Sequence, residues 1–493
     1  MNSLLPEDFH FGVAMSGYQV EGGFNGPGEP ANNWCWWERA GRVEPSGIAV
    51  DFWNRAEEYL DLAAGMGCDM VRLGIEWARV EPAEGQIDAE ALARYAAIVD
   101  ACTERGMAPL VTLHHFTHPA WLGEDFWLRP DSAERFATWA EIVVDMMAPR
   151  CRHWVTLNEI NIVSMGSYLF GVMPPGRRGA VGDMVVAADN MLSAHVRAYE
   201  VIHDRQPDAL VTTNNASASV YELDRLLVDL LFARSAGVDR ADIGSWIADR
   251  RQAWYAELAP PSAFETLVRA ATRAGSPYGS GPGGSSGRGV GAGWISRLAN
   301  GGQAPSRSLD AIYASPYQRT LDVVGFDYYD PVATHHVRFP GHRTAGGRSW
   351  FPGRMLWDDA PYPEGLTAYC RANAFDGIGL WVVENGMCNR VRNGRSYDRM
   401  DGWTRPRYLR ENMAAVVRAI DAGWPVQGYL HWSLVDNYEW GSYEPRFGIH
   451  GVDRERGLAI LGTDAMGEDS AGEYRRLIEG LRSGDRSVLD PPW

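Results

Sequence analysis

The sequence of 493 residues contains no lysine: all 46 basic residues are arginine, against 63 Asp and Glu residues. The net charge of −17 disfavours binding to nucleic-acid phosphates and to an anionic membrane surface. A coding bias toward Arg and Ala is sufficient to explain the missing lysine. The composition therefore predicts a protein whose partners include neither nucleic acid nor a membrane.

Cysteine is also scarce, and long apolar runs are absent. The six cysteines, at 35, 68, 102, 151, 370 and 388, form no Cys-x-x-Cys pair and no zinc-type spacing. No run of eighteen apolar residues suggests a membrane span, and the N-terminal segment 1–12 has neither the basic nor the apolar region of a signal peptide. We expect a cytoplasmic protein with free thiols, no metal and no cofactor. The cluster His114, His115 and His118 leaves a metal site as an alternative.

What the sequence does contain is a series of short apolar runs separated by amphipathic segments, with 45% hydrophobic residues overall. The runs predict strands at 9–19, 69–77, 108–116, 153–160, 209–217, 321–329, 380–386 and 425–434. The segments between them predict helices that include 52–66, 88–106, 131–149, 183–205 and 405–423. Asp131 and Glu134 fit a capping box at the start of the third of these helices. Eight strands that alternate with helices predict an α/β fold, a closed (β/α)8 TIM barrel.

The interval between 217 and 321 is longer than the other gaps between strands. It contains helical patterns at 221–235 and 262–274, followed by a Gly/Ser-rich stretch at 275–293. This composition predicts a flexible loop. A linker between two domains is the competing interpretation, but the strand at 321–329 is needed to complete the eight. We therefore expect one catalytic domain, 1–493, with long βα loops.

Two glutamates lie at the ends of apolar runs, Glu159 in HWVTLNEI and Glu384 in LWVVENGM. In a TIM barrel the reacting groups gather at the carboxyl ends of the strands. The predicted ends carry amides, aromatics and carboxylates, namely Gln19, Arg72, Glu76, His115, Asn158, Glu159, Asn214, Asn215, Tyr328, Tyr329, Glu384 and Trp432. Such a mixture suits sugar hydroxyls and the C–H faces of sugar rings. Two acids that face each other across one bond are what glycoside hydrolysis requires.

Four motifs occur in the order found in a known family. FHFGVAMSGYQVEGG (9–23) resembles the opening strand of glycoside hydrolase family 1, the β-glucosidase family. TLNEI (156–160) resembles its acid/base motif and VVENG (382–386) its nucleophile motif. HWSLVDNYEWGSYEPRFGIHGVD (431–453) resembles its eighth strand and the following loop. The resemblance covers almost the whole chain.

The resemblance implies a retaining mechanism. Glu159 would be the general acid/base and Glu384 the nucleophile, with carboxyl groups roughly 5–5.5 Å apart. Arg72 and Tyr329 resemble the residues that bond to the family nucleophile and keep it ionised. Glu159 must begin protonated, and its pKa should fall when the charge of Glu384 is lost to the ester.

The same resemblance implies a pocket for one sugar ring. Asn158 would bind the 2-hydroxyl, and Trp432 would form the floor of the pocket. The remaining hydroxyls would be held by Gln19, His115, Glu439 and Trp440.

Three departures from the family pattern concern this pocket. Phe116-Thr117 follows His115 where a Trp-Asp pair is common, so one hydrogen-bond donor is missing. Asp327 occupies a position that is usually Asn, which adds a negative charge near Glu384 unless Asp327 is protonated or paired. The loop between Trp440 and Tyr443 is one residue shorter than usual. These changes leave the preferred sugar open.

The expected function is a retaining exo-β-glycosidase for β-glucosides and for β-galactosides or β-fucosides, with a small glycoside as its partner and no defined oligomeric state. Phospho-sugar hydrolases of the family lack the Glu at the position of Glu439 and use a Lys that this chain does not have. Plant-type thioglucosidases lack the acid/base that Glu159 would supply. The alternatives are a transglycosylase that uses the same intermediate and a non-catalytic sugar-binding barrel.

Overall fold

The computed structural model describes residues 4–218, 220–257, 306–329, 361–392, 395–397, 399 and 401–491. Its central sheet consists of parallel strands in the order β5-β4-β3-β2-β1-β11-β8-β7-β6. The strands are β1 (His10–Ala14), β2 (Met70–Gly74), β3 (Ala108–Thr112), β4 (His153–Val155), β5 (Leu210–Thr212), β6 (Asn214–Ala216), β7 (Val323–Tyr328), β8 (Gly379–Asn385) and β11 (Val426–Trp432).

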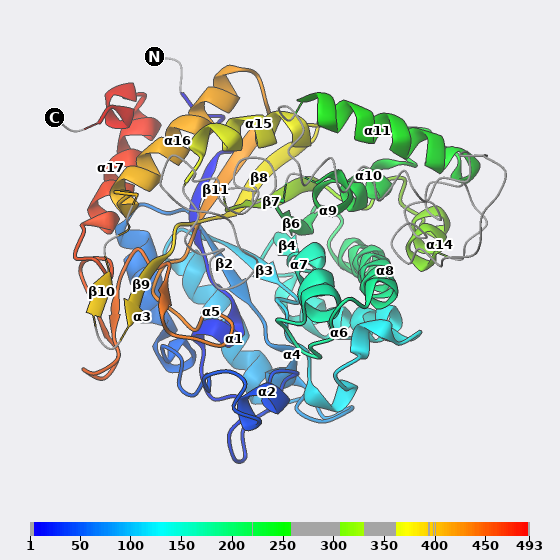
Figure 1. Ribbon diagram of the computed structural model, residues 1–493, viewed down its shortest axis with the longest axis horizontal. Helices are drawn as coiled ribbons and strands as arrows, with labels where there is room; N and C mark the ends of the chain where they lie inside the picture. Colours follow the sequence, from blue (N-terminus) through cyan, green and yellow to red (C-terminus); the bar gives the residue numbers. More distant parts are fainter. Residues whose placement is uncertain are drawn as a thin grey trace, which may run out of the picture.

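The sheet closes on itself at Thr213, the single residue between β5 and β6. β5 pairs with β4 on one side and β6 pairs with β7 on the other, so one chain segment joins the two ends of the sheet. The predicted strand 209–217 is thus divided into two pieces that share one position in the barrel. This closure confirms the predicted (β/α)8 TIM barrel (Figure 1).

All eight predicted strands are present, but several end earlier than the apolar pattern suggests. The first strand stops at Ala14, so Gln19 lies in the short helix α1 (Gly17–Val20). The fourth stops at Val155, which leaves Asn158 and Glu159 beyond the strand. Glu159 has a φ of 42°, in the left-handed region, so an extended strand cannot continue through it. The catalytic candidates therefore lie on the loops that follow the strands.

Helices surround the barrel in Figure 1, and the five predicted ones are confirmed as α3 (Phe52–Gly65), α5 (Ala89–Glu104), α6 (Ser132–Met147), α8 (Val181–Arg205) and α16 (Arg405–Asp421). The other α-helices are α2 (Cys35–Arg39), α4 (Trp77–Val80), α7 (Ile160–Ser164), α9 (Tyr221–Asp224), α10 (Leu226–Phe232), α11 (Ile243–Glu257), α14 (Arg307–Ala314), α15 (Pro363–Asn373) and α17 (Ser470–Ser483). Short 3-10 turns are η1 (Ala120–Leu122), η2 (Phe126–Leu128), η4 (Arg240–Asp242) and η6 (Arg486–Leu489), and η3 (Met165–Phe170) is a π-helix. No helix of the described ranges is long and apolar enough to cross a membrane.

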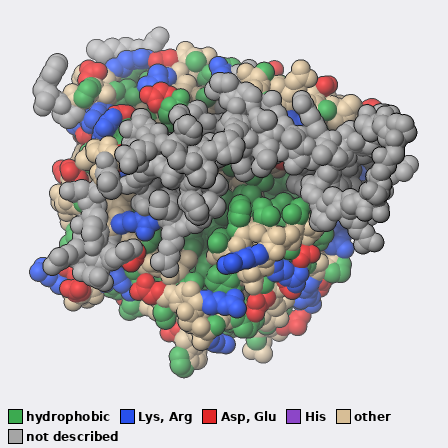
Figure 2. Space-filling view, viewed as in Figure 1, with side chains coloured by type: hydrophobic (Ala, Val, Ile, Leu, Met, Phe, Trp, Pro, Cys, Tyr) green, Lys and Arg blue, Asp and Glu red, His purple; other side chains and the backbone are tan. Residues whose placement is uncertain are grey.

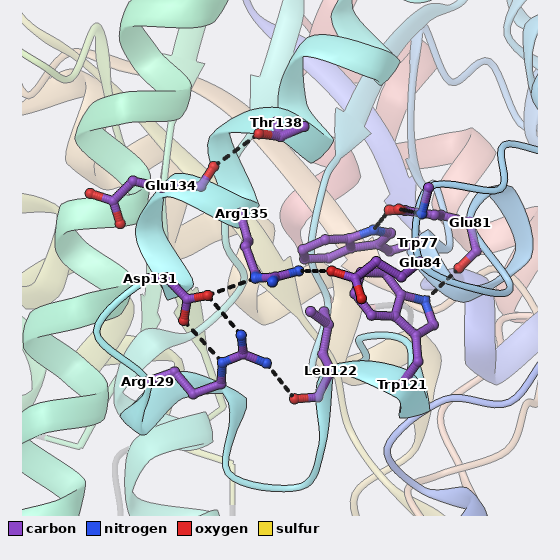
Figure 3. Close-up of polar contacts among 11 residues, drawn as sticks. Trp77, Glu81, Glu84, Trp121, Leu122, Arg129, Asp131, Glu134, Arg135 and Thr138 are labelled. Atoms are coloured by element: carbon purple, nitrogen blue, oxygen red, sulfur yellow. Dashed lines mark hydrogen bonds and ion pairs between the residues drawn. The ribbon is translucent and has the colours of Figure 1, made fainter.

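The predicted capping box at α6 is wrong. Asp131 occupies the N-cap position but its side chain bonds to no backbone N–H of the helix. Its carboxylate instead accepts hydrogen bonds from Arg129, at 2.7 and 3.0 Å, and from Arg135, at 2.7 Å (Figure 3). Two guanidinium groups are stronger partners for a carboxylate than a backbone amide. Arg135 also reaches Glu84, so Asp131 contributes to a surface ion-pair network.

The interval between 217 and 321 does not separate two sheets, since β6 and β7 on either side of it are neighbours in the barrel. The helical pattern at 221–235 corresponds to α9 and α10. The pattern at 262–274 and the Gly/Ser-rich stretch at 275–293 lie outside the described residues.

Two small sheets complete the loops after β8 and β11. One consists of β9 (Asn389–Arg392), β10 (Arg395–Tyr397) and β12 (Pro445–Arg446), and the other of β13 (Val452–Asp453) and β14 (Ala459–Ile460). β9 pairs with β12, which ties the loop after β8 to the loop after β11. Both loops follow strands that carry predicted site residues.

Candidate active site

Arg72 lies at the centre of the barrel because side chains alternate between the two faces of β2. Met70 belongs to the apolar cluster inside the barrel, while Val71 and Leu73 pack against the outer helices. Arg72, two residues after Met70, therefore points inward and is completely buried. Its Nε donates to Thr112 Oγ1 of the adjacent strand at 2.9 Å, which fixes the guanidinium plane.

Glu384 also points into the barrel, but alternation alone would not place it there. Val383 already belongs to the interior cluster, so the next residue of a regular strand would face outward. The register of β8 shifts at this point: Val382 pairs with Phe326 of β7, whereas Glu384 pairs with the next residue, Asp327. This β-bulge turns Glu384 inward, and bulges commonly re-aim side chains beside active sites.

Two donors hold the Glu384 carboxylate. Arg72 Nη1 forms a buried ion pair with Oε1, and the Tyr329 hydroxyl donates to Oε2 at 2.7 Å. With both oxygens engaged by donors, the carboxylate has a fixed orientation. These two contacts are the ones that the sequence resemblance implies for Arg72 and Tyr329.

Glu159 and Glu384 are brought together with Asp327. One carboxyl oxygen from each of the three lies within 4.8 Å of the other two. All three are buried, with exposed fractions of 6% for Glu159, 3% for Glu384 and 0% for Asp327. The separation of Glu159 and Glu384 is close to the roughly 5–5.5 Å of retaining glycosidases and far below the range of inverting ones.

The surroundings of the two glutamates shift their pKa values to different extents. Burial raises the pKa of Glu384, and Arg72 and Tyr329 oppose that rise. Burial raises the pKa of Glu159 well above its usual range, and the negative charge of Glu384 raises it further. The rise is therefore larger for Glu159 than for Glu384, so Glu384 is the more readily ionised of the two.

Asn158 is oriented by three neighbours. Its Oδ1 accepts from Arg72 Nη2 at 2.5 Å and from Asn214 Nδ2 at 2.7 Å. Its Nδ2 lies 3.2 Å from His115 Nε2. Because Arg72 binds both Asn158 and Glu384, one guanidinium links the amide to the carboxylate.

A second polar group lies between the first and last strands of the barrel. Gln19 Nε2 donates to Glu439 Oε2 at 3.2 Å and to Asn437 Oδ1 at 3.1 Å. Trp432 Nε1 donates to the other oxygen of Glu439 at 3.1 Å. Burial raises the pKa of Glu439 to about 8, although the donors lower it. These side chains can exchange hydrogen bonds with a hydroxyl-rich ligand.

Aromatic rings flank His115 on two sides. Its ring is stacked with those of Trp432 and Trp440, each with a centroid distance of 5.6 Å. Phe116 packs on Trp440 at 4.6 Å. Burial lowers the pKa of His115 well below its usual value, so the imidazole is neutral. The predicted site residues thus form one continuous group from Gln19 to Glu384.

A sequence profile of glycosyl hydrolase family 1 matches residues 1–250 and 308–464. The chain belongs to this family. Membership makes it a glycoside hydrolase.

Relatives of known activity match over nearly the whole chain. Beta-glucosidase A of Thermotoga maritima is 26% identical over 475 residues, 91% of this chain and 93% of the relative. A 6-phospho-beta-galactosidase of Staphylococcus aureus is 26% identical over 482 residues, 92% of this chain and 95% of the relative. The solved beta-glucosidase from Thermotoga maritima in complex with deoxynojirimycin superposes with a TM-score of 0.71 at 23% identity, covering 97% of this chain and 99% of that one. The structural likeness supports the barrel.

Not every strand-end residue of this family 1 hydrolase joins the site. Tyr328 points outward and donates to the Tyr362 carbonyl at 2.6 Å. Asn215 bonds to the Asp224 carbonyl at 3.3 Å. Glu76 accepts a hydrogen bond from the Tyr18 backbone N–H of α1 and lies outside the group around Glu384. In each pair of adjacent candidates along β6 and β7, one side chain faces the barrel interior and the other faces the helices.

Thr117, which belongs to the Phe116-Thr117 departure from the family pattern, contacts the buried Glu76. Thr117 Oγ1 donates to Glu76 Oε2 at 2.7 Å, and the Tyr18 backbone N–H donates to Oε1 at 2.8 Å. Burial raises the pKa of Glu76 to about 8, and the nearby Glu21 adds to this rise. The segment between β2 and α4 therefore supplies a buried carboxyl that the Thr117 hydroxyl contacts.

The shortened loop forms a tight turn after Glu439. The Glu439 N–H donates to the Ser442 carbonyl at 2.9 Å, and Trp440 and Gly441 have positive φ angles of 44° and 108°. A side chain at Gly441 would meet Val43 at 2.6 Å. The turn thus places Trp440 directly against His115.

In the part of the chain that the structure describes, the histidine cluster does not form the group of side chains that could hold a metal ion. The ligand atoms close enough to share a cation belong to Glu159, Asp327 and Glu384 instead. His114 and His118 are buried and stacked at 6.3 Å, and burial lowers the pKa of both. They act as neutral core residues behind His115.

Three residues of the site were not singled out by the sequence resemblance: Thr112, Asn214 and Asn437. Each bonds to a predicted site residue and orients it. Thr112 is the last residue of β3 and Asn214 the first residue of β6, and both side chains face inward, a signal that the strand pattern contained. Asn437 follows Asp436 in a loop, and nothing in its local sequence distinguishes it.

Proposed function

We propose that this family 1 hydrolase is a retaining, exo-acting β-glycosidase that cleaves small β-glucosides, β-galactosides and β-fucosides through a glycosyl-enzyme. The observation that carries the proposal is the approach of the Glu159 and Glu384 carboxyls to within 4.8 Å. A gap of this size leaves no space for the water that an inverting enzyme activates between its acids.

In the first step, Glu384 attacks the anomeric carbon and the glycosidic bond breaks. Glu159 donates its proton to the departing oxygen, so the aglycone leaves as an alcohol. Arg72 and Tyr329 hold both oxygens of Glu384 and limit its motion during attack. Asn158, held by Arg72 and Asn214, is oriented to bond the 2-hydroxyl as positive charge develops on the ring.

In the second step, water attacks the anomeric carbon of the glycosyl-enzyme. Glu384 is now a neutral ester, so the charge that raised the pKa of Glu159 is gone. Glu159, ionised after the first step, accepts a proton from the water. Glu384 leaves as the carboxylate, and the sugar is released with the β configuration retained.

The pocket is suited to an uncharged hexose. Gln19, Glu439 and Trp432 combine two donors with a carboxyl acceptor, which can serve an equatorial or an axial 4-hydroxyl. A phosphate would instead meet Glu439, and the chain offers no lysine to pair with it. Arg and acidic side chains are also interspersed over the coloured part of the face in Figure 2, without a broad basic patch. We therefore assign the activity to neutral glycosides, although a 6-phospho-beta-galactosidase is among the relatives.

Replacement of the acid/base tests the proposal. Glu159→Ala should slow alkyl glycosides far more than dinitrophenyl glycosides, because a good leaving group needs no proton. The loss on the poor substrates should be on the order of 10²–10⁴-fold. Azide should restore turnover of the dinitrophenyl glycoside and yield the β-glycosyl azide, by entering the space left by the carboxyl.

The matched control is Glu76→Gln, which alters another buried glutamate outside the catalytic group. Azide should not accelerate this variant. Equal slowing of all substrates by Glu159→Ala, with no effect of azide, would show that Glu159 is not the acid/base.

A further inference from the structure

Asp327 adds a third carboxyl to a centre that needs two. The β-bulge that turns Glu384 inward pairs it with Asp327 across β7 and β8. Asp327 is fully buried, and its Oδ2 accepts a hydrogen bond from Asn214 Nδ2. Asp327 Oδ1 is buried and accepts no hydrogen bond from the described residues. A proton on this oxygen is therefore favoured over a negative charge.

The carboxyl of the neighbouring Glu159 lacks a hydrogen-bond donor among the amide, hydroxyl and guanidinium groups of the described residues. A carboxyl oxygen of Asp327 lies within 4.8 Å of one of its oxygens, and the Asp327 side chain opposes the rise of the Glu159 pKa. Glu159 must nevertheless become a buried carboxylate when it protonates the leaving group. A buried carboxylate without a donor is strongly destabilised.

The charges around Asp327 favour its neutral form. It faces Glu384 on β8, Glu159 after β4, Arg72 on β2 and Tyr329 at the end of its own strand. Arg72 is already paired with Glu384. Burial and the two neighbouring carboxylates raise the pKa of Asp327 well above its usual range, and Arg72 opposes them.

We propose that Asp327 is a proton-bearing positioning residue whose carboxylic O–H donates a hydrogen bond to Glu159 once Glu159 has given up its own proton. This inference rests on the proposed role of Glu159 as acid/base. The O–H of Asp327 stabilises the ionised form of Glu159 and orients it toward the attacking water. No proton leaves Asp327 during turnover.

Two substitutions at Asp327 separate the effect of a donor from that of a charge. Asp327→Asn keeps the shape and offers an N–H donor, so the pKa of Glu159 should stay within a few tenths of a unit. Asp327→Leu has similar volume but no donor, so the ionised form of Glu159 loses support and its pKa should rise by about one unit or more.

The measurement is the alkaline limb of kcat/KM for 4-nitrophenyl β-glucoside, which reports the loss of the Glu159 proton in the free enzyme. We expect the limb to remain in place in Asp327→Asn and to move to higher pH in Asp327→Leu. A shift to lower pH in both variants would overturn the inference, because it would mean that wild-type Asp327 carries a negative charge. An unmoved limb in Asp327→Leu would show that no donor acts on Glu159. If the Leu variant does not fold, Asp327→Asn alone decides: an unmoved limb supports the inference, and a shift to lower pH overturns it.

The same profile for Glu159→Gln keeps this inference separate from the proposed function. If the limb persists in Glu159→Gln, it belongs to another group, and the acid/base assignment is wrong. If the limb disappears in Glu159→Gln, it belongs to Glu159. If it then shifts in the Asp327 variants in a direction contrary to expectation, only the role of Asp327 is wrong.

Discussion

Replacing Tyr329 with Phe removes one defined interaction from the proposed nucleophile. The hydroxyl donates to Glu384 Oε2 at 2.7 Å; Glu384 is buried and Tyr329 is partly buried. A hydrogen bond to a charged group contributes roughly 1.5–3 kcal/mol. Since 1.36 kcal/mol corresponds to one pKa unit, the pKa of Glu384 should rise by about one to two units in Tyr329→Phe.

The sign of the effect on activity follows from the requirement for an ionised nucleophile. Activity is lost when pH falls through the pKa of Glu384, so a higher pKa moves the acidic limb of kcat/KM to higher pH. The assay uses a dinitrophenyl β-glucoside, because its cleavage does not depend on the Glu159 proton. At neutral pH the rate should fall by roughly tenfold or more.

Tyr328→Phe is the matched control. This tyrosine is the preceding residue of the same chain segment, but its hydroxyl donates to the Tyr362 carbonyl outside the site. The acidic limb should therefore not move in Tyr328→Phe. An unchanged limb in Tyr329→Phe, or an equal shift in both variants, would refute the assignment of Tyr329 as the donor that keeps Glu384 ionised.

Further consequences concern the ion pair, buried charge and substrate range. Arg72→Met should lower kcat/KM by roughly a hundredfold or more, because it leaves Glu384 without its buried cation; a loss smaller than that of Tyr329→Phe would contradict this. The pKa of Glu76 rises on folding from 4.5 to about 8, so its ionisation weakens the folded state progressively between these values. Urea unfolding of Glu76→Gln should accordingly show a smaller loss of stability than wild type from roughly pH 5 to pH 8, and parallel losses would exclude this cause. Aryl β-glucosides, β-fucosides and β-galactosides should have kcat/KM values within about a hundredfold, a gap of ~3 kcal/mol, and 6-phosphoglycosides should not be cleaved; a strong preference for a phosphorylated sugar would show that the pocket has been misinterpreted.

Much of the barrel could be predicted because its strands are buried on both faces and stand out as short apolar runs. The same property hides the direction of individual side chains. In LWVVEN every position is apolar up to Glu384, so nothing in the pattern reveals the register shift that turns Glu384 inward. The family motif identified Glu384, whereas the bulge explains how it reaches the interior.

Local signatures were less successful where a side chain has more than one available partner. Asp131 fits the capping pattern, yet Arg129 and Arg135 take its carboxylate. Asn214 and Asn215 are equivalent in sequence, and only the closure of the barrel at Thr213 determines that Asn214 reaches Asn158. The choice between the two asparagines depends on which strands become neighbours, information that the local sequence does not contain.

Trapping of the glycosyl-enzyme tests the central claim most directly. A 2-deoxy-2-fluoro-β-glucosyl fluoride should form the covalent intermediate and hydrolyse slowly, so that the intact protein gains the mass of one fluorosugar. Peptide mapping should place this label on Glu384, and NMR of normal turnover should show the β-anomer as the first product. A label on any other residue, or the α-anomer as the first product, would contradict double displacement through Glu384.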